Sequence, residues 1–407
     1  MTEAIRKSLR DSSAARWSAL FIVSFTMMCG YFLTDIMAPL AGLLEGQLGW
    51  SRAEYGTFTS AYGWFNVFLL MLIFGGIILD KLGVRMTGLG AATVMVIGTA
   101  IKYWAVSTDS LEGQTLFGLD AQVLWASIGF AIFAIGVEVA GITVSKIIVK
   151  WFKGKELATA MGMEMAMARI GTALALGFSV PIAKATGAVD VSRPVLVALI
   201  GLCIGLISFI VYVMMDKKLD ASEATGLVEE KNPEDEFKLS DIGKILGNRG
   251  WWFIAILCVL FYSAVFPFLK YATDLMVNKF GVAEDLAGMI PMLLPFGNIL
   301  LTPLFGGIYD KKGKGATIMI IGASLLILVH ALFSVPGLNS WIFAMVLEKY
   351  CITGQTVRDG LTVNTYDYTL PMLIFTSFGM LALIFAFLLK AEDKRKGYGL
   401  ESPNIQR

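Results

Sequence analysis

Ten long apolar segments restrict what this chain can fold into. They lie at about 17–42, 56–79, 86–107, 122–148, 157–182, 194–215, 250–273, 286–308, 316–335 and 369–390. A helix rises about 1.5 Å per residue, so about 20 residues cross a hydrocarbon core about 30 Å thick. With 56% hydrophobic residues, the 407-residue chain is not an ordinary soluble domain. The pattern predicts an all-α polytopic membrane protein.

The basic residues predict how the segments are oriented. Most of the 33 Lys and Arg lie in the loops that share a side with the N-terminus. Because positive loops stay in the cytoplasm, both termini are predicted to be cytoplasmic. The basic arm at 1–16 lacks an apolar core and a cleavage site, so no cleaved signal peptide is expected.

A polar region at 216–249 predicts a division of the chain. It separates an N-terminal half, 17–215, from a C-terminal half, 250–390, which is followed by a cytoplasmic tail at 391–407. The middle of the region, EEKNPEDE, is typical of a linker. Its end, FKLSDIGKIL, has apolar residues at helical spacing, which predicts an interfacial helix on the inner leaflet.

One motif occurs twice and supports this division. It reads Gly76-xxx-Asp80-Lys81-x-Gly83 after the second segment and Gly306-xxx-Asp310-Lys311-x-Gly313 after the eighth. Both copies lie on the predicted inside, which indicates two homologous halves. A glycine turn with an Asp and nearby bases, Arg85 included, fits a latch that holds helix ends in one state. The predicted latch residues are Gly76, Asp80, Lys81, Gly83, Arg85, Asp310 and Lys311.

Two opposite charges lie near the middle of the fourth and fifth segments. A charge such as Glu138 or Arg169 costs at least about 2.5–3.5 kcal/mol there, so it should face a bundle interior or a water-filled cavity. The two helices are antiparallel neighbours, so a structural ion pair is one interpretation. A substrate clamp is the other, in which Glu138 holds an ammonium and Arg169 grips a carboxylate with two N–H groups.

Further polar residues of the apolar segments are candidates for the same site. They are Tyr31, Asp35, Tyr62, Asn66, Tyr262 and Lys270. Tyrosines are also common interface anchors, and Lys270 has Asp274 one turn away as a plain partner. Glu164 lies five residues before Arg169, about 140° around the helix, so a structural role is expected for it.

The loop GIILDKLGVR resembles the signature of the major facilitator superfamily. That resemblance implies two six-helix halves around a central cavity that opens alternately to each side. Three longer segments resemble the lysosomal dipeptide uniporter branch of that superfamily and its bacterial relatives. They are SAYGWFNVFLLMLIFGGIILDKLG, WFKGKELATAMGMEMAMARIG and FYSAVFPFLKYATDLMVNKFGV. The resemblance implies that Glu138 and Arg169 bind the two ends of a peptide and that transport is uncoupled.

The sequence departs from that family near its C-terminus. Only SWIFAMVL separates the ninth segment from Glu348 and Lys349, and eight apolar residues cannot cross a bilayer as a helix. We expect about ten spans instead of twelve, with about two absent between Leu347 and Glu348. The C-terminal half would then hold about four spans.

These observations predict a secondary transporter for a small zwitterion, most concretely a dipeptide. A proton-coupled peptide or organic-anion carrier is an alternative, and a non-transporting scaffold or defective remnant is another. The sequence has no Walker motif, nucleophile elbow or metal-binding spacing. We therefore expect no ATP-driven transport, no enzyme activity, no cofactor and no metal. The expected partners are a small solute and the lipid bilayer, and the net charge of +1 does not indicate nucleic acid. A bacterial inner membrane is the predicted location, with the lysosomal membrane as the alternative.

Overall fold

The computed structural model describes residues 9–152, 155–223, 239–334 and 369–402. Nearly all of these residues are helical, and β1 pairs with β2 in an antiparallel hairpin. In chain order the elements are η1 (Leu9–Asp11), α1 (Ser13–Asp35), η2 (Ala38–Leu40), α2 (Ala41–Leu48), α3 (Arg52–Ser60), η3 (Ala61–Gly63), η4 (Trp64–Phe68), α4 (Met71–Ser107), η5 (Asp109–Leu111), β1 (Thr115–Leu116), β2 (Leu119–Asp120), α5 (Ala121–Phe152), α6 (Leu157–Ala183), α7 (Ser192–Glu223), α8 (Leu239–Leu246), α9 (Arg249–Phe280), α10 (Glu284–Ala287), α11 (Met289–Lys312), α12 (Gly315–Ser334) and α14 (Thr369–Lys396).

Nine helices within the described ranges are long and apolar enough to cross a membrane. The predicted all-α membrane class is confirmed. The ten predicted spans are consistent with these nine helices, because α4 joins the end of the second predicted segment to the third across the non-helical residue Gly83. After α3, a 3-10 turn and a π-helical turn lead to Leu70, whose backbone is left-handed, before α4 begins. The same helix, α4, then includes the third predicted segment. It bends at Gly83, whose φ of 73° is a conformation that glycine adopts without strain.

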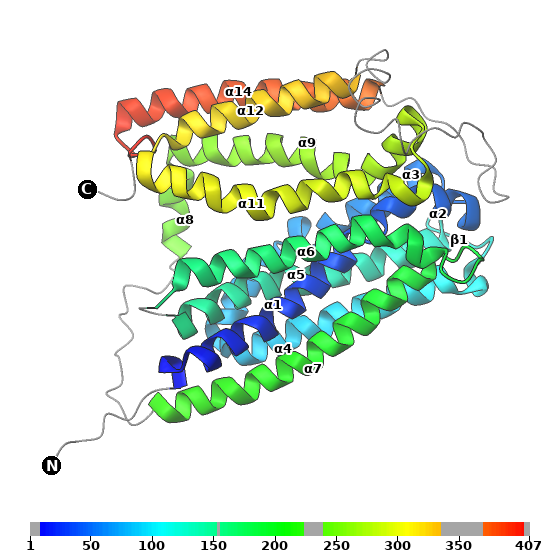
Figure 1. Ribbon diagram of the computed structural model, residues 1–407, viewed down its shortest axis with the longest axis horizontal. Helices are drawn as coiled ribbons and strands as arrows, with labels where there is room; N and C mark the ends of the chain where they lie inside the picture. Colours follow the sequence, from blue (N-terminus) through cyan, green and yellow to red (C-terminus); the bar gives the residue numbers. More distant parts are fainter. Residues whose placement is uncertain (1–8, 153–154, 224–238, 335–368, 403–407) are drawn as a thin grey trace. The chain divides into compact units, whose positions relative to one another are not determined.

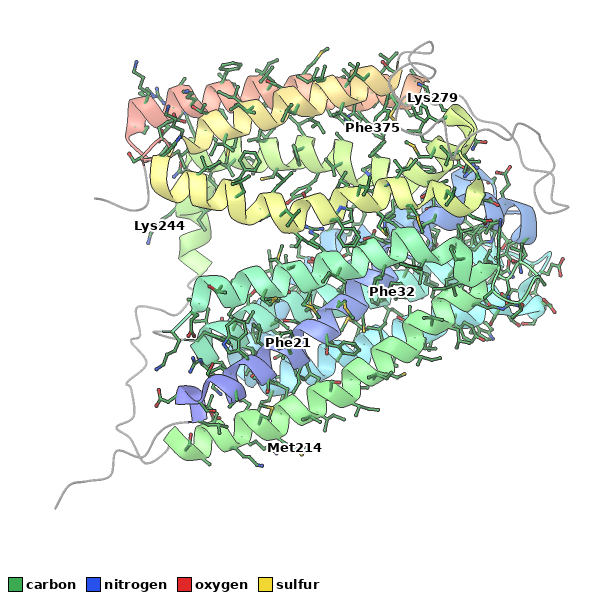
Figure 2. All side chains as sticks on the ribbon, in the orientation of Figure 1. Phe21, Phe32, Met214, Lys244, Lys279 and Phe375 are labelled. Atoms are coloured by element: carbon green, nitrogen blue, oxygen red, sulfur yellow. The ribbon has the colours of Figure 1, made fainter. Side chains whose placement is uncertain are left out.

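The described residues form two compact units. The first holds those within 1–228 and 284–299, and the second those within 229–283, 300–355 and 364–407. In the first unit the helices α1, α4, α5, α6 and α7 run lengthwise beside one another (Figure 1). Helix α4 packs against α5 and α7, and α1 packs against α5, α6 and α7. Met214 lies on the outer side of α7, where a lipid-facing side chain is expected (Figure 2).

Glycines bring the backbones of α4 and α5 into direct contact. A Cβ atom on Gly98 would lie 2.3 Å from the backbone nitrogen of Phe133, and one on Gly129 would lie 2.6 Å from that of Lys102. Small residues allow this approach, and membrane helices gain much of their packing energy from it. The contact holds α5, and with it Glu138, against α4.

Substituting Gly98 by alanine tests this contact. Overpacking costs about 1–3 kcal/mol where side chains can move aside, and Gly98→Ala meets backbone, so we expect a loss of about 3 kcal/mol or more. Gly90, also on α4, has no atom within 4 Å of the position that a Cβ would occupy. Gly90→Ala should therefore be neutral or stabilise by up to about 1 kcal/mol. Thermal unfolding of the purified variants measures both changes, and equal melting temperatures would contradict the packing argument.

The core of the second unit lies between α9, α12 and α14. Leu257, Ala323, Ala382 and Ala386 form a small buried cluster between these helices. His330 on α12 is buried, and its Nδ1 lies 3.0 Å from the carbonyl oxygen of Leu326. The rings of Phe268 and Phe375 pack edge-on against it at 5.5 and 5.6 Å, with Phe375 marked in Figure 2. These contacts fit a structural role for this histidine.

Helix α8 lies just before α9, at the end of the predicted linker. The segment predicted as an interfacial helix forms α8, and the indole of Trp252 donates a hydrogen bond of 2.8 Å to the carbonyl of Leu246 at its end. Its place on the inner leaflet stays a prediction, as do the two halves and the cytoplasmic termini. The position between Leu347 and Glu348 lies outside the described residues.

Candidate functional site

Two close approaches of α1 place Glu138 and Arg169. Gly30 on α1 would carry a Cβ only 2.9 Å from the side chain that precedes Glu138 on α5. Gly171 on α6, two residues after Arg169, would carry a Cβ 2.2 Å from the carbonyl oxygen of Met28. Since neither glycine has a side chain, α1 packs closely against both helices at the level of the two charges.

Tyr31 on α1 lies among the charged residues of the site. The guanidinium carbon of Arg169 is 5.8 Å from the centroid of the Tyr31 ring, which is a cation–π contact. The charges of Arg169, Glu138, Glu164 and Asp35 all act electrostatically on the Tyr31 phenol. Three acids and one base are therefore gathered near one tyrosine.

Tyr62 binds the acid of α5. Its hydroxyl donates a hydrogen bond of 2.5 Å to Oε1 of Glu138, and its ring packs 5.6 Å from that of Phe130. Tyr62 lies in the 3-10 turn η3, where the second predicted segment departs from a regular helix. This polar contact inside the unit differs from the interface-anchor role that was the alternative for Tyr62.

Glu138 and Arg169 do not neutralise each other. Among the described residues, no ion pair within 4.0 Å joins Glu138 to Arg169. Direct pairing, which the short connection between the two helices suggested, is therefore absent here. The physical reason is that α1 packs against both α5 and α6 and provides Tyr31 as a contact for Arg169. An acid and a base that stay apart leave room for a ligand with two opposite charges.

Asn66 lies one turn beyond Tyr62 in the π-helical turn η4. Its Nδ2 donates a hydrogen bond of 3.3 Å to the carbonyl of Tyr62. Its Oδ1 is buried and has no hydrogen-bond partner within the part of the chain that is described. A buried acceptor without a donor costs about 1–3 kcal/mol, and a ligand's N–H group would satisfy it. π-Helical turns often occur at functional sites for this kind of reason.

The other predicted site residues have different surroundings. Asp35 ends α1 and is buried, and it interacts with other parts of the protein. Lys270 and Asp274, on α9 in the second unit, also have interaction partners. Tyr262, on the same helix, is 52% exposed and packs 5.1 Å from Phe266. The structure thus brings Tyr31, Tyr62, Glu138 and Arg169 together in the first unit, whereas Lys270 and Tyr262 belong to the second.

Sequence reasoning assigned no site role to Glu164. This acid is 7% exposed and lies on the buried stripe of α6 that also contains Ala160 and Ala168. The angle of about 140° between Glu164 and Arg169 compares only the directions of their Cβ atoms. The long side chain of Arg169 reaches the Tyr31 ring, and Glu164 acts on the same tyrosine. No hydrogen bond or ion pair within 4.0 Å joins Glu164 to Arg169 in the described part of the chain, so their separation on the helix stays a prediction, although both charges act on Tyr31.

Lys102 lies within the third predicted apolar segment, 86–107. It is fully buried on α4. Its ammonium lies 4.5 Å from the ring centroid of Phe130 and 5.0 Å from that of Phe58. Two aromatic faces therefore stabilise its charge beside the ring that supports Tyr62. Its position in an otherwise apolar run is the sequence signal from which its burial could have been predicted.

The predicted latch residues make two kinds of contact. Asp80 forms an exposed ion pair of 2.6 Å with Lys146 of α5, while Lys81 is exposed and Gly76 has open space at its Cβ position. Arg85 lies 3.0 Å from Asp220 of α7. The side chains of Asp310 and Lys311 lie outside the described residues.

A buried carboxylate forms the centre of a charge network beside that latch. Asp216 of α7 is fully buried, and the Lys150 ammonium lies 2.9 Å from it. The indole N–H of Trp151 and the hydroxyl of Tyr212 each donate to it at 3.1 Å. Arg85 approaches the same carboxylate at 3.7 Å. These bonds connect α4, α5 and α7 at one end of the first unit.

The sequence matches the family Major Facilitator Superfamily over residues 20–357, more than four-fifths of the chain. This chain belongs to the Major Facilitator Superfamily. It is 26% identical over 339 residues to the lysosomal dipeptide transporter MFSD1 of Danio rerio. This alignment covers 81% of this chain and 69% of the Danio rerio protein. The Homo sapiens protein of that name is 25% identical over 345 residues, or 82% and 70% of the two chains.

Solved structures share the fold of this superfamily member. A bacterial homologue of the human drug peptide transporters PepT1 and PepT2 has a TM-score of 0.56 at 13% identity, covering 92% of this chain and 98% of its own. A bacterial homologue of the human lysosomal transporter Spinster, inward-facing and occupied, has a TM-score of 0.57 at 14% identity, covering 94% and 74%. The family and its relatives identify the chain as a membrane transporter and not an enzyme.

Proposed function

We propose that this chain moves small zwitterionic solutes, most concretely dipeptides, across a membrane by alternating access and without a coupling ion. The observation that carries the proposal is the separation of Glu138 from Arg169 around Tyr31. A zwitterion has an ammonium and a carboxylate of the same molecule at fixed ends. One acid and one base that are held apart in a membrane interior match those ends.

The ammonium end of the substrate is assigned to Glu138. The Tyr62 hydroxyl bonds one of its oxygens, so the carboxylate is oriented and its other oxygen stays available for an incoming N–H. Asn66, one turn from Tyr62, has the buried Oδ1 acceptor that lacks a donor among the described residues. An ammonium carries three donors and is able to use both acceptors.

The carboxylate end is assigned to Arg169. Its planar guanidinium lies near the Tyr31 ring, which restricts its orientation and leaves the N–H groups at its edge for a ligand. Arginine binds a carboxylate through two parallel hydrogen bonds, and such charge-assisted bonds are about twice as strong as neutral ones. Six relatives named as lysosomal dipeptide transporters, including those compared above, support a peptide as the substrate.

The proposal extends to the gating machinery and the location. Asp80, Lys81 and Arg85 would form the latch at the inside ends of the helices. The linker predicted at 216–249 starts later than expected, because α7 continues to Glu223 and buries Asp216, and the segment between α7 and α9 would join two rocking halves. We place this multi-pass membrane protein in a bacterial inner membrane, with the lysosomal membrane as the alternative.

Thermal stabilisation of the purified chain tests the function. The panel contains dipeptides, free amino acids and organic acids, because a ligand that binds the folded state raises its melting temperature. We expect a shift with dipeptides that free amino acids and organic acids do not produce. A shift with organic acids alone supports an anion carrier instead. A folded sample that responds to nothing supports the scaffold or remnant alternative.

Uptake into proteoliposomes tests the uncoupled mechanism. Dipeptide accumulation should follow the dipeptide gradient and be unchanged by an imposed pH gradient. Uphill accumulation of the dipeptide driven by a proton gradient would contradict the uniport mechanism and support the proton-coupled alternative.

The hydroxyl of Tyr62 gives a further prediction. Tyr62→Phe removes the hydrogen bond to Glu138, and bonds to charged groups contribute about 1.5–3 kcal/mol, so dipeptide affinity should fall by about tenfold. Tyr103→Phe, which removes a hydroxyl from α4 away from Glu138, is the matched control and should bind as the wild type does. Isothermal titration calorimetry measures the dissociation constants of both variants. Equal dipeptide affinities for the two would contradict a role of Tyr62 in binding.

A further inference from the structure

Lys102 of α4 is a buried cation to which the proposed function gives no role. It is fully buried, and it lies in a helix that is long and apolar enough to cross a membrane. A charge in such a place is costly, so it is commonly retained for a specific task. Its ammonium lies 5.0 Å from the ring centroid of Phe58 and 4.5 Å from that of Phe130. Since these rings belong to α3 and α5, the side chain contacts two other helices at once.

The backbone of Lys102 is held directly against α5. A Cβ atom on Gly129 would lie 2.6 Å from the backbone nitrogen of Lys102. Gly129 comes immediately before Phe130, over whose ring the ammonium lies. The main chains of α4 and α5 therefore approach closely at this level, as small residues in membrane helices allow. This contact restricts where the Lys102 side chain starts and keeps its charge near the rings.

The rings below the ammonium hold α3 on α5. Phe58 and Phe130 are stacked, with ring centroids 5.0 Å apart and ring planes 19° apart. Helix α3 has only nine residues, and helices of this length depend on tertiary contacts for their stability. Helix α3 and the turns η3 and η4 that follow it all pack against α5. A cation over both rings strengthens this contact, because cation–π attraction is greatest where water is excluded.

Tyr62 lies about one helical turn after Phe58, in η3. Its ring is 5.6 Å from that of Phe130, and its hydroxyl donates a hydrogen bond of 2.5 Å to Oε1 of Glu138. The position of α3 on α5 therefore determines whether this hydroxyl reaches the carboxylate. A continuous series of contacts connects the Lys102 ammonium, through the stacked rings and Tyr62, to the acid of the site.

We propose that Lys102 is a positioning residue for the dipeptide site, whose charge keeps α3 on α5 so that the Tyr62 hydroxyl stays bonded to Glu138. This inference rests on the proposed function, in which Glu138 binds the substrate ammonium. Lys102 does not touch the substrate in this role. A side chain that served packing alone would be replaceable by an uncharged one of similar length without a change in dipeptide affinity.

Dipeptide dissociation constants of Lys102→Met and Lys102→Arg test the inference, with the dipeptide that stabilises the wild type most. Methionine has a similar length but no charge, so affinity should fall by about fivefold. Arginine keeps the charge and stacks on aromatic rings, so affinity should stay within about twofold of the wild type. Lys217→Met removes the same charge from an exposed residue of α7 and should bind as the wild type does.

A double variant separates positioning from a general loosening of the fold. In Tyr62→Phe there is no hydroxyl bond to Glu138 for Lys102 to maintain. Adding Lys102→Met to Tyr62→Phe should therefore change the affinity by less than about twofold, whereas two independent effects would multiply.

The possible failures are distinguishable. Wild-type affinity in Lys102→Met, an equal loss in Lys102→Arg, or a further loss of about fivefold in the double variant overturns the role of Lys102 and leaves the proposed function intact. A folded wild type that binds no dipeptide overturns the proposed function and this inference with it. If Lys102→Met does not elute as a monodisperse protein, Phe58→Leu removes one aromatic face and keeps an apolar side chain. It should lower affinity by about twofold to threefold when Tyr62 is present and leave it unchanged in Tyr62→Phe, and any other result overturns the inference.

Discussion

Replacing Arg169 by lysine is expected to weaken dipeptide binding by about 100-fold, which corresponds to about 2.7 kcal/mol. Both side chains carry a positive charge, so the loss comes from geometry. Lysine lacks the planar fork that makes two parallel bonds to a carboxylate, and its ammonium does not stack on the Tyr31 ring as the guanidinium does. Isothermal titration calorimetry with the dipeptide that stabilises the wild type most measures the change.

The control for this prediction is the same substitution at Arg193. That residue lies in the first turn of α7, where it pairs with Asp190 and donates hydrogen bonds to backbone carbonyls of Ala183 and Ala188 at and after the end of α6, away from Tyr31. Arg193→Lys should leave dipeptide affinity unchanged. If Arg169→Lys also binds as the wild type does, and melts at the wild-type temperature, the clamp is wrong.

Replacing Asp216 by asparagine is expected to destabilise the protein by about 3–5 kcal/mol. The carboxylate is fully buried, and Lys150, Trp151 and Tyr212 all bond to it. Asparagine is neutral and offers one acceptor oxygen, so the Lys150 charge loses its main buried partner and α5 separates more easily from α7. A lowered melting temperature of the purified variant measures this loss.

Asp80→Asn is the matched control for that substitution. Asp80 forms its ion pair with Lys146 where both side chains are about half exposed or more. Water screens such a pair, and pairs of this kind contribute about 0–1 kcal/mol. Its melting temperature should therefore stay close to that of the wild type. Equal destabilisation by both substitutions would show that burial of Asp216 is not the cause.

The class of the protein and its most informative residues could be read from the sequence. Apolar runs longer than a bilayer is thick permit few folds other than a helical membrane protein, because backbone groups in lipid must be satisfied within each segment. The repeated motif around Asp80 indicated the family, which the family match confirms. Glu138 and Arg169 were recognisable since charges within apolar runs are costly and therefore rarely incidental.

The contacts among those residues depended on packing between segments far apart in the chain. The approach of α1 through Gly30 and Gly171 keeps Glu138 from Arg169, and it brings Tyr31 to the guanidinium. Nothing in the local pattern of any one segment contains that information. Hydropathy averages over a segment and so predicted a regular helix at 56–79, whereas the turn that carries Tyr62 to Glu138 departs from one.

Glu164 shows most clearly what a sequence pattern leaves out. A helical wheel separated it from Arg169, because the wheel records the directions in which side chains leave one helix. The site is determined by where long side chains end and by which neighbouring helix they meet. Segment length and charge placement are properties of the chain itself, so they determined the membrane fold and the candidate residues. Which charges gather around Tyr31 depends on how the helices pack together, and only the tertiary structure supplies that information.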